Sequence, residues 1–231
     1  MTSTKRLKVC LFTASSHRPI FLRHCIFQLQ QQTYPHHHSI YVNSNHFKTE
    51  SDSTNYLQFV SDIRVKAPNK IFLGYGKTRH QHDNHMEALN LVKANHYDLY
   101  LKVDDDDIYF PNYIENVVTS YLDHKWDISG SYSDGIINKN QVNRKIKYLA
   151  LNTHKDNPLH IMPGTLAFSF KAINYLKNEF NSFFDPLFFE DEQWIKYLCS
   201  RQDIQPFIRT KSNYVYHIHD TNICKPKITS S

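Results

Sequence analysis

Short apolar runs alternate with amphipathic stretches along the first half of the chain. Four segments are apolar and β-prone, and they predict buried strands: 7–13, 39–42, 71–73 and 98–103. Stretches between them carry apolar residues at helical spacing, and they predict helices: 20–32, 54–63 and a segment ending at Ala94. Strand and helix therefore alternate, which is typical of an α/β fold built on a parallel sheet.

The second half begins with the clearest helical pattern and then becomes mixed. Apolar positions at helical spacing predict a helix over 111–122, and 126–132 predicts a strand. After Asp134 the pattern favours partly antiparallel structure, with a turn and strand at 162–168 and a last strand at 213–218. Two more helices are predicted, over 171–180 and from about 188.

This order predicts a single domain over 1–231. Its first half, about 1–110, has the pattern of a nucleotide-binding unit, and about 111–223 would complete the site. The last residues, 224–231, are expected to form a loose tail.

Composition narrows the class of partner only slightly. The chain has 14% aromatic residues, with 15 Tyr and 15 Phe but only 5 Gly, and this excludes a disordered protein. The net charge of +5 is compatible with anionic partners such as nucleotides or membrane headgroups. Basic residues are scattered and form no stripe, so we expect no nucleic-acid binding.

The cysteine pattern and the short apolar runs together favour a location in the cytoplasm. The four cysteines form no CxxC pair, and Cys10 and Cys25 lie in apolar patterns that predict buried thiols. The first apolar run is too short for a signal peptide, and no run approaches the about 20 residues of a membrane span. We expect a cytoplasmic protein, and contact with the inner face of a membrane is compatible with this.

Four consecutive carboxylates, Asp104–Asp107, follow the strand at 98–103 and precede Pro111. Adjacent acids repel one another, and a hard divalent cation such as Mg²⁺ or Mn²⁺ would offset that repulsion. A solvated acidic loop is the alternative for any acid run. The position at the end of a strand, where open α/β sheets bind ligands, favours the cation.

Four segments together resemble the GT-A glycosyltransferases, in particular the inverting family 2. They are Thr13–Pro19, Gln31-Gln-Thr-Tyr-Pro35, the acid run with its DXD-like spacing, and Glu190-Asp191 about 85 residues further along. The resemblance implies a Rossmann-like nucleotide-binding half with a mixed central sheet, continuous with an acceptor-binding half. It also implies nucleotide-sugar chemistry that depends on a metal.

By this resemblance, Asp106 would bind the metal, Mn²⁺ or Mg²⁺. Asp104 would face the ribose or assist the metal, and Asp105 or Asp107 would support them. Successive side chains of an extended segment alternate sides, which favours a site made by Asp104 and Asp106.

A second carboxylate is needed because inverting transfer requires a general base for the acceptor hydroxyl. The resemblance assigns this role to Asp191, with Glu190 as the runner-up. The alternative is that both acids only stabilise the N-terminus of a helix.

The resemblance places the nucleotide along Thr13 and Ser15, with Arg18 close by. Asn43 stands where the family usually has an aspartate that contacts the base, which puts uridine specificity in question. Lys77 or Arg79 would meet the nucleotide or diphosphate, and a solvated basic loop is an equal alternative.

Histidines are abundant, at 15, but few suggest a site. The run 36–38 is predicted to be an exposed loop, and His82 and His85 share a helix face without an evident third ligand. Family members often carry a histidine near the end of the domain that reaches the metal or diphosphate, and the Tyr-x-x-His-x-x-Asn pattern favours His219 over His217. A surface histidine is the alternative. Gly164-Thr165 resembles the loop that closes beside the donor sugar and acceptor in the family, and an ordinary turn is the alternative.

The sequence therefore predicts a metal-dependent, hexosyltransferase-like enzyme of polysaccharide biosynthesis. It would move a sugar from a nucleotide donor, which we expect to be UDP-linked, to a hydroxyl of a glycan or lipid-linked acceptor. The alternatives are a nucleotidyltransferase that makes sugar nucleotides and a non-catalytic metal- or sugar-binding module.

Overall fold

The structure is a computed structural model of the chain. The residues it describes are 6–16, 18–45, 54–56, 58–59, 61–62, 70–92, 97–138, 149–151, 159–180, 183–186 and 189–218. The predicted tail, Cys224 and His219 lie outside these residues.

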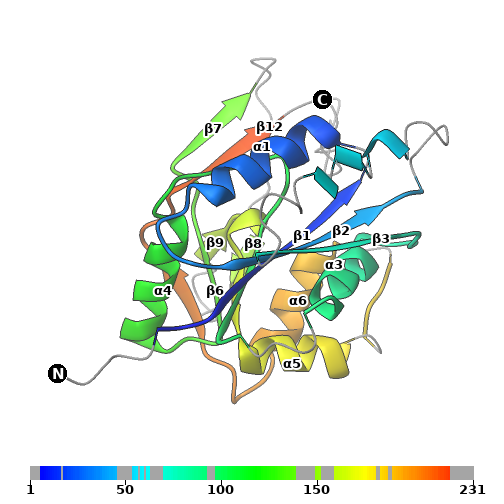
Figure 1. Cartoon of the computed structure of the whole chain (residues 1–231). Coiled ribbons are helices and arrows are strands. Elements are labelled where there is room, and N and C mark those ends of the chain that lie inside the picture. The colour runs from blue at the N-terminus through cyan, green and yellow to red at the C-terminus, as the bar shows by residue number, and fades with distance from the viewer. Residues whose placement is uncertain are drawn as a thin grey trace, which may run out of the picture.

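A seven-stranded sheet forms the centre of the molecule (Figure 1). Its strands, in spatial order, are β11 (Pro206–Arg209), β6 (Ile128–Ser131), β10 (Ala167–Ser169), β4 (Leu99–Lys102), β1 (Val9–Ser16), β2 (His37–Asn43) and β3 (Ile71–Gly76). Only β10 runs antiparallel to its neighbours; the other pairs are parallel. The predicted mixed central sheet is therefore confirmed.

Helices cover both faces of this sheet. They are α1 (Pro19–Gln30), α3 (Gln81–Asn90), α4 (Tyr113–His124), α5 (Phe170–Asn178) and α6 (Glu190–Cys199). Alternate residues of β1 separate two cores: Cys10 and Phe12 pack with α3, α5 and α6, whereas Val9 and Leu11 pack with α1 and α4. This is the period of two expected of a strand buried on both sides.

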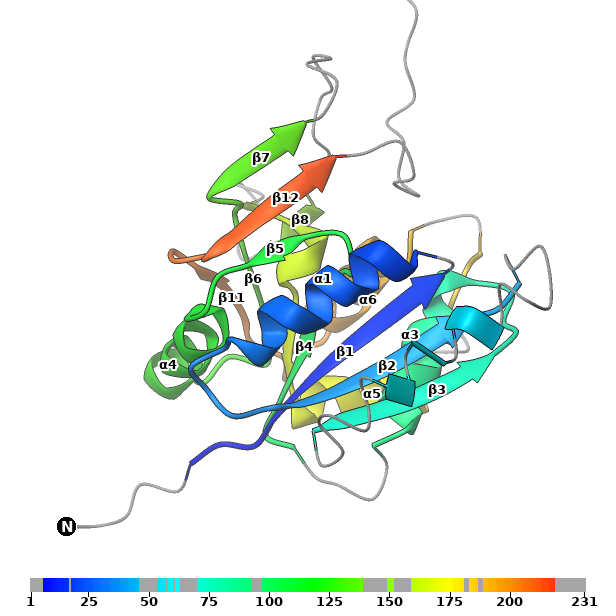
Figure 2. The same ribbon diagram turned by 45° about the horizontal axis from the view of Figure 1, so that its top comes forward.

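Two small sheets lie beside the central one (Figure 2). One joins β5 (Ile108–Tyr109), β12 (Tyr214–Ile218) and β7 (Gly135–Asn138); the other pairs β8 (Leu149–Leu151) with β9 (Leu159–Ile161). Most of these strands have four or fewer residues, which is too short for a periodic pattern to reveal. Because β4 and β5 belong to different sheets, the acid run between them links the two.

Two predicted loops, at 74–79 and 36–38, differ from the structure. The predicted loop at 74–79 starts later than expected, because β3 continues to Gly76. Glycine fits at position 76, whereas a Cβ there would clash with the Tyr41 hydroxyl on β2. The prediction that 36–38 is an exposed loop is wrong. Strand β2 begins at His37, and its parallel register with β1 buries His38 against Thr13.

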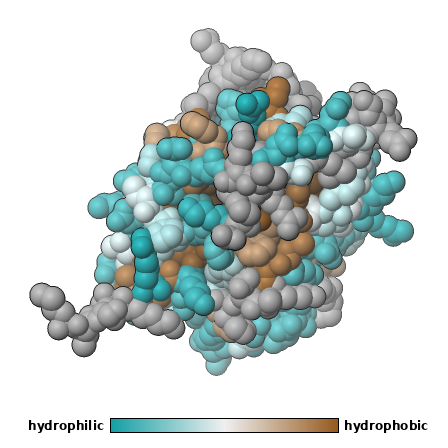
Figure 3. All heavy atoms as spheres, viewed as in Figure 1, coloured by the Kyte–Doolittle hydropathy of each residue, from teal (hydrophilic) through white to brown (hydrophobic). Residues whose placement is uncertain are grey.

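The predicted burial of two thiols is confirmed, since Cys10 and Cys25 are both buried and free. Within the described part of the chain, no helix has the length and apolarity needed to cross a bilayer. On the face seen in Figure 3, apolar patches are separated by hydrophilic side chains.

Arg209 on β11 is a buried cation, 2% exposed, that ties the 3₁₀ turn η1 (Pro163–Thr165) to the sheet. Its guanidinium donates to Ser129 Oγ and to the Thr165 carbonyl oxygen. Burial lowers the pKa of Arg209 below its ordinary value.

Arg209→Leu is expected to reduce the free energy of unfolding by about 2–4 kcal/mol, because two buried acceptors lose a charged donor. Urea unfolding followed by circular dichroism measures the change. Arg23→Leu is the matched control, since Arg23 is exposed on α1, and should change stability by less than about 0.5 kcal/mol. Equal stability of the two variants would contradict this role for Arg209.

Candidate functional site

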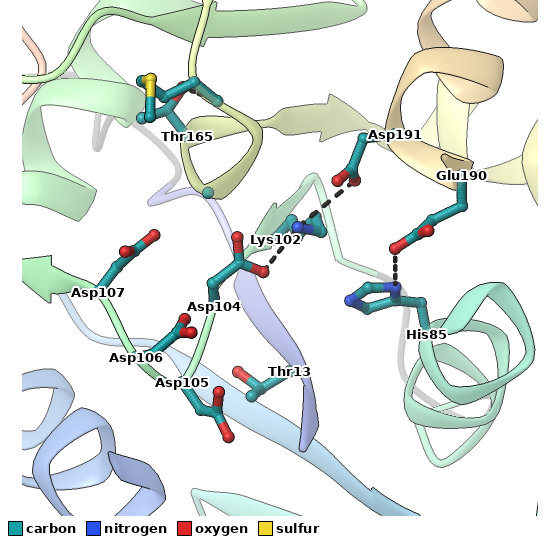
Figure 4. A network of polar contacts seen from close by, with 12 residues as sticks. Thr13, His85, Lys102, Asp104, Asp105, Asp106, Asp107, Thr165, Glu190 and Asp191 are labelled. Atoms are coloured by element: carbon teal, nitrogen blue, oxygen red, sulfur yellow. Dashed lines mark hydrogen bonds and ion pairs between the residues drawn. The ribbon is translucent and has the colours of Figure 1, made fainter. Parts of the chain in front are cut away.

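The four consecutive carboxylates form a tight turn between β4 and β5. The Asp107 amide lies 3.5 Å from the Asp104 carbonyl oxygen, which closes the turn. The predicted alternation of side chains along an extended segment is therefore wrong, because a turn brings residues three apart together. Asp104 and Asp107 lie against Gly164, whereas Asp105 and Asp106 meet Arg18. Figure 4 shows the four side chains.

Arg18 holds the pair formed by Asp105 and Asp106. One guanidinium nitrogen donates to Asp105, and the other donates to Asp106 at 2.6 Å. Ser15 Oγ also donates to Asp105, at 2.6 Å. Burial raises the pKa of Asp105 to about 7, although Arg18 opposes the shift. Two residues predicted along the nucleotide, Ser15 and Arg18, thus contact the acid turn directly.

Asp107 is a buried member of the turn, 2% exposed. The Tyr214 hydroxyl donates to one of its oxygens, and the His217 amide donates to the other at 3.1 Å. Burial, and then the neighbouring carboxylates, raise the pKa of Asp107 well above its ordinary value. A Cβ at Gly164 would lie 2.6 Å from Asp107 Oδ2, so the predicted sugar loop packs directly on the turn.

Lys102, the last residue of β4, is the central residue that the sequence prediction missed. Its ammonium group is 2.6 Å from Asp104 Oδ1 and 3.4 Å from Asp191 Oδ1, and the residue is 2% exposed (Figure 4). Burial would lower the pKa of Lys102, but Asp104, Asp191 and Glu190 together raise it above its ordinary value. The signal was a lysine in an otherwise apolar strand, next to the acids.

Glu190 and Asp191, the two candidates for the general base, are the first two residues of α6, and their side chains contact different partners. Asp191 faces Lys102, whereas Glu190 Oε1 lies 3.7 Å from His85 Nδ1 (Figure 4). Burial raises the pKa of Asp191 well above its ordinary value against the opposing charge of Lys102. Burial also raises the pKa of Glu190. Asp191 Oδ1 has no hydrogen-bond partner among the described residues, so its ion pair with Lys102 is loose.

The other predicted nucleotide residues have varied surroundings. Thr13 is fully buried, and its hydroxyl is 2.8 Å from His38 Nε2. The Asn43 side chain donates to Thr78 and accepts from the Asn45 amide, so it organises the loops after β2 and β3. Arg79 is exposed.

Two of the histidines considered as metal ligands lie in different surroundings. His82 accepts a hydrogen bond of 3.1 Å from Trp194 Nε1 and stacks on Phe184, which makes it a core residue. His217, the less favoured candidate, lies at the acid turn, with its Nδ1 3.2 Å from the Asp106 carbonyl oxygen. The favoured residue, His219, lies outside the described residues, so its role stays a prediction.

The acid turn is compatible with a divalent cation that completes its ligands from a substrate. Among the described residues, no group of three or more His, Cys, Asp or Glu side chains is arranged to hold a metal by itself. Mg²⁺-like ions usually take one or two protein carboxylates and substrate phosphates. The side chains of Asp106 and Asp104 are 10% and 26% exposed, so both reach the surface of the turn. Their hard oxygen atoms suit Mn²⁺ or Mg²⁺.

Solved glycosyltransferase structures share this arrangement of strands and helices. Residues 1–349 of TarS from S. aureus, in complex with UDP-GlcNAc, match with a TM-score of 0.61 at 14% identity, over 94% of this chain and 60% of that chain. The mannosyltransferase PcManGT from Pyrobaculum calidifontis, in complex with GDP-Man and Mn²⁺, matches with a TM-score of 0.62 at 12% identity, over 95% of this chain and 59% of that chain.

A nucleotidyl-type enzyme is also similar. The 4-diphosphocytidyl-2C-methyl-D-erythritol synthase from Anaerococcus prevotii matches with a TM-score of 0.57 at 13% identity, over 90% of this chain and 89% of that chain. No family model matches the sequence, and a search of curated proteins finds no match.

The chain therefore has the GT-A fold, as predicted, and it spans about 60% of the length of the two glycosyltransferase chains. At these identities the likeness establishes the fold alone. The activity has to be argued from the site.

Proposed function

We propose that the chain is an inverting, metal-dependent glycosyltransferase that moves a hexose-type sugar from a nucleotide donor, UDP-linked by preference, to a hydroxyl of a glycan or lipid-linked acceptor. One observation carries the proposal: Asp104 of the acid turn and Asp191 of α6 meet across the single ammonium group of Lys102, at 2.6 and 3.4 Å. Glycosyl transfer needs a leaving-group site beside a base, and these carboxylates supply both.

The acid turn forms the donor side. Asp106 would hold Mn²⁺ or Mg²⁺ with help from Asp104, and the bound ion would neutralise charge on the departing diphosphate as a Lewis acid. Arg18 fixes the Asp106 carboxylate at 2.6 Å and fixes Asp105 behind it. Because these contacts exist before substrate arrives, the carboxylates are preorganised.

Asp191 forms the acceptor side. As an acceptor oxygen attacks C1 of the donor sugar, Asp191 takes the hydroxyl proton, and the bond between C1 and the diphosphate oxygen breaks with its electron pair leaving on the nucleotide. Lys102 favours the ionised form that a base needs, because the lysine charge opposes the rise in the pKa of Asp191 that burial causes, although burial still holds this pKa above its ordinary value.

The second candidate is a nucleotidyltransferase, favoured by the likeness to the diphosphocytidyl enzyme, whose length this chain nearly spans. Such an enzyme needs a basic, glycine-rich loop for a triphosphate. The segment after β1 has no glycine, and the guanidinium of Arg18 is engaged by Asp105 and Asp106. The glycosyltransferase is therefore the better supported function.

Thermal stabilisation by nucleotide sugars tests the proposal. UDP-glucose, UDP-GlcNAc and GDP-mannose are each added with Mn²⁺ or with EDTA, and the melting temperature is recorded. At a ligand concentration 100 times the Kd, the folded state gains about 2.7 kcal/mol. At least one sugar nucleotide should stabilise the chain with Mn²⁺ only. Stabilisation by a nucleoside triphosphate alone would favour the second candidate, and no stabilisation by any nucleotide would refute both.

A further inference from the structure

His85 of α3 is a buried side chain whose polar atoms are unsatisfied. It is 1% exposed, and neither ring nitrogen has a hydrogen-bond partner among the described residues. The rings of Phe12 and Trp194 stand edge-on to it, at 5.9 and 5.4 Å between centroids. Buried polar groups without partners cost free energy and are rare, so each one calls for an explanation. One turn earlier on the same helix, His82 is satisfied by Trp194.

The surroundings of His85 keep its ring neutral. Burial, and then the charges of Lys102 and His82, lower the pKa of His85 well below its ordinary value. A neutral imidazole has one N–H donor and one acceptor nitrogen. Its Nδ1 lies 3.7 Å from Glu190 Oε1, and a hydrogen bond needs about 2.9 Å, so a shift of about 1 Å completes the bond. Such bonds are often long before substrate binds.

Glu190 and Asp191 therefore have different neighbours although they are adjacent in sequence. Asp191 faces the cation of Lys102, whereas Glu190 faces the neutral ring of His85 (Figure 4). Their side chains are 14% and 13% exposed, so both reach the surface of the site. Different environments for paired carboxyls indicate different roles. The paired cation suits Asp191 to a base, and the neutral ring suits Glu190 to hydrogen bonding.

Glu190 lies beside the half of the chain that is predicted to bind the nucleotide. Its partner His85 belongs to α3, which packs on β1 and β2, the strands of the nucleotide-binding half. A group bound by Glu190 is thus next to that half. Glu190 and Asp191 would repel a ligand that carries a carboxylate. They would instead accept hydrogen bonds from the hydroxyl groups of a ligand.

We propose that His85 is a positioning residue that orients Glu190 to receive a hydroxyl group of the transferred sugar. This rests on the proposed function. The sugar is then a neutral one, because a hexuronic acid would bring a carboxylate against Glu190 and Asp191.

The test compares binding of the best sugar nucleotide from the thermal screen with binding of its nucleoside diphosphate alone, by calorimetry with Mn²⁺. In His85→Leu the Kd of the sugar nucleotide should rise about 10-fold or more, while the Kd of the diphosphate stays unchanged. His85→Asn should restore much of the loss, because its side-chain nitrogen lies near the position of Nδ1. The wild type should also bind UDP-glucose at least about 10-fold more tightly than UDP-glucuronate.

His82→Leu is the matched control, since it removes a histidine of the same helix that bonds to Trp194 rather than to Glu190. It should lower the melting temperature and leave the ratio of the two Kd values unchanged. Glu190→Gln gives a second route if His85→Leu does not fold, and it should show the same selective loss. Normal sugar-nucleotide binding by His85→Leu, or by Glu190→Gln, would overturn the inference. If the wild type binds no sugar nucleotide, the proposed function fails first.

Discussion

Asp191→Asn is expected to slow sugar transfer by about 10²–10⁴-fold, the usual contribution of a general base. Asparagine has nearly the same shape, so α6 should keep its place, but its amide cannot take the acceptor proton. Donor binding should be almost unchanged, because the proposed diphosphate site is the acid turn and not α6. The measurement is steady-state transfer from the sugar nucleotide identified by the thermal screen, with donor Kd measured in parallel.

Asp123→Asn is the matched control, because Asp123 is exposed near the end of α4. It should transfer at the wild-type rate. If Asp191→Asn also transferred at the wild-type rate, the base would be another group, and a Glu190→Gln variant that lost transfer at saturating donor would identify Glu190 as that base.

The pH dependence of the wild type gives an independent check of the same assignment. Burial raises the pKa of Asp191 well above its ordinary value. A base acts in its deprotonated form, so transfer should fall as the pH drops through this raised pKa, at a higher pH than an ordinary aspartate would give. Asp191→Asn should lack this acid limb in its residual activity.

Both halves of the proposed site were predictable because each carries a local signal. Asp104 follows an apolar strand at the ligand edge of a sheet, and Asp191 stands in the first turn of a helix. What local patterns do not encode is which elements meet. That α6 brings Asp191 to the end of β4 depends on packing around Trp194 and Leu198, a contact between distant parts of the chain.

The misjudged residues share this cause. Lys102 was not singled out, because its role appears only when Asp104 and Asp191 converge on it. His38 looked exposed, because the parallel register that places it beside Thr13 is a long-range property. Polar side chains on a buried sheet are therefore the hardest residues to assign without a structure.

Asp106→Asn is expected to abolish the Mn²⁺-dependent stabilisation by a sugar nucleotide and to slow transfer about 10³-fold, since metal charge stabilisation contributes several kcal/mol. The Asp106 carboxylate is partly exposed, and its Oδ2 accepts a hydrogen bond from Arg18 at 2.6 Å. The fold should survive, because asparagine can still accept that hydrogen bond. Titration of Mn²⁺ at a fixed donor concentration, followed by melting temperature, measures the loss.

Asp105→Asn is the contrasting variant in the same turn. Asp105 is 1% exposed and accepts hydrogen bonds from both Ser15 and Arg18, so its carboxylate is committed to the protein. It should lower the melting temperature without substrate yet keep a response to Mn²⁺. The opposite result would exchange the roles of the two residues: Asp105→Asn would be stable but would lose the response to Mn²⁺, and Asp106→Asn would keep that response. The guanidinium group of Arg18 contacts both carboxylates, so a change at either one affects the other. The two variants together therefore distinguish the residue that stabilises the turn, Asp105, from the residue that binds the metal, Asp106.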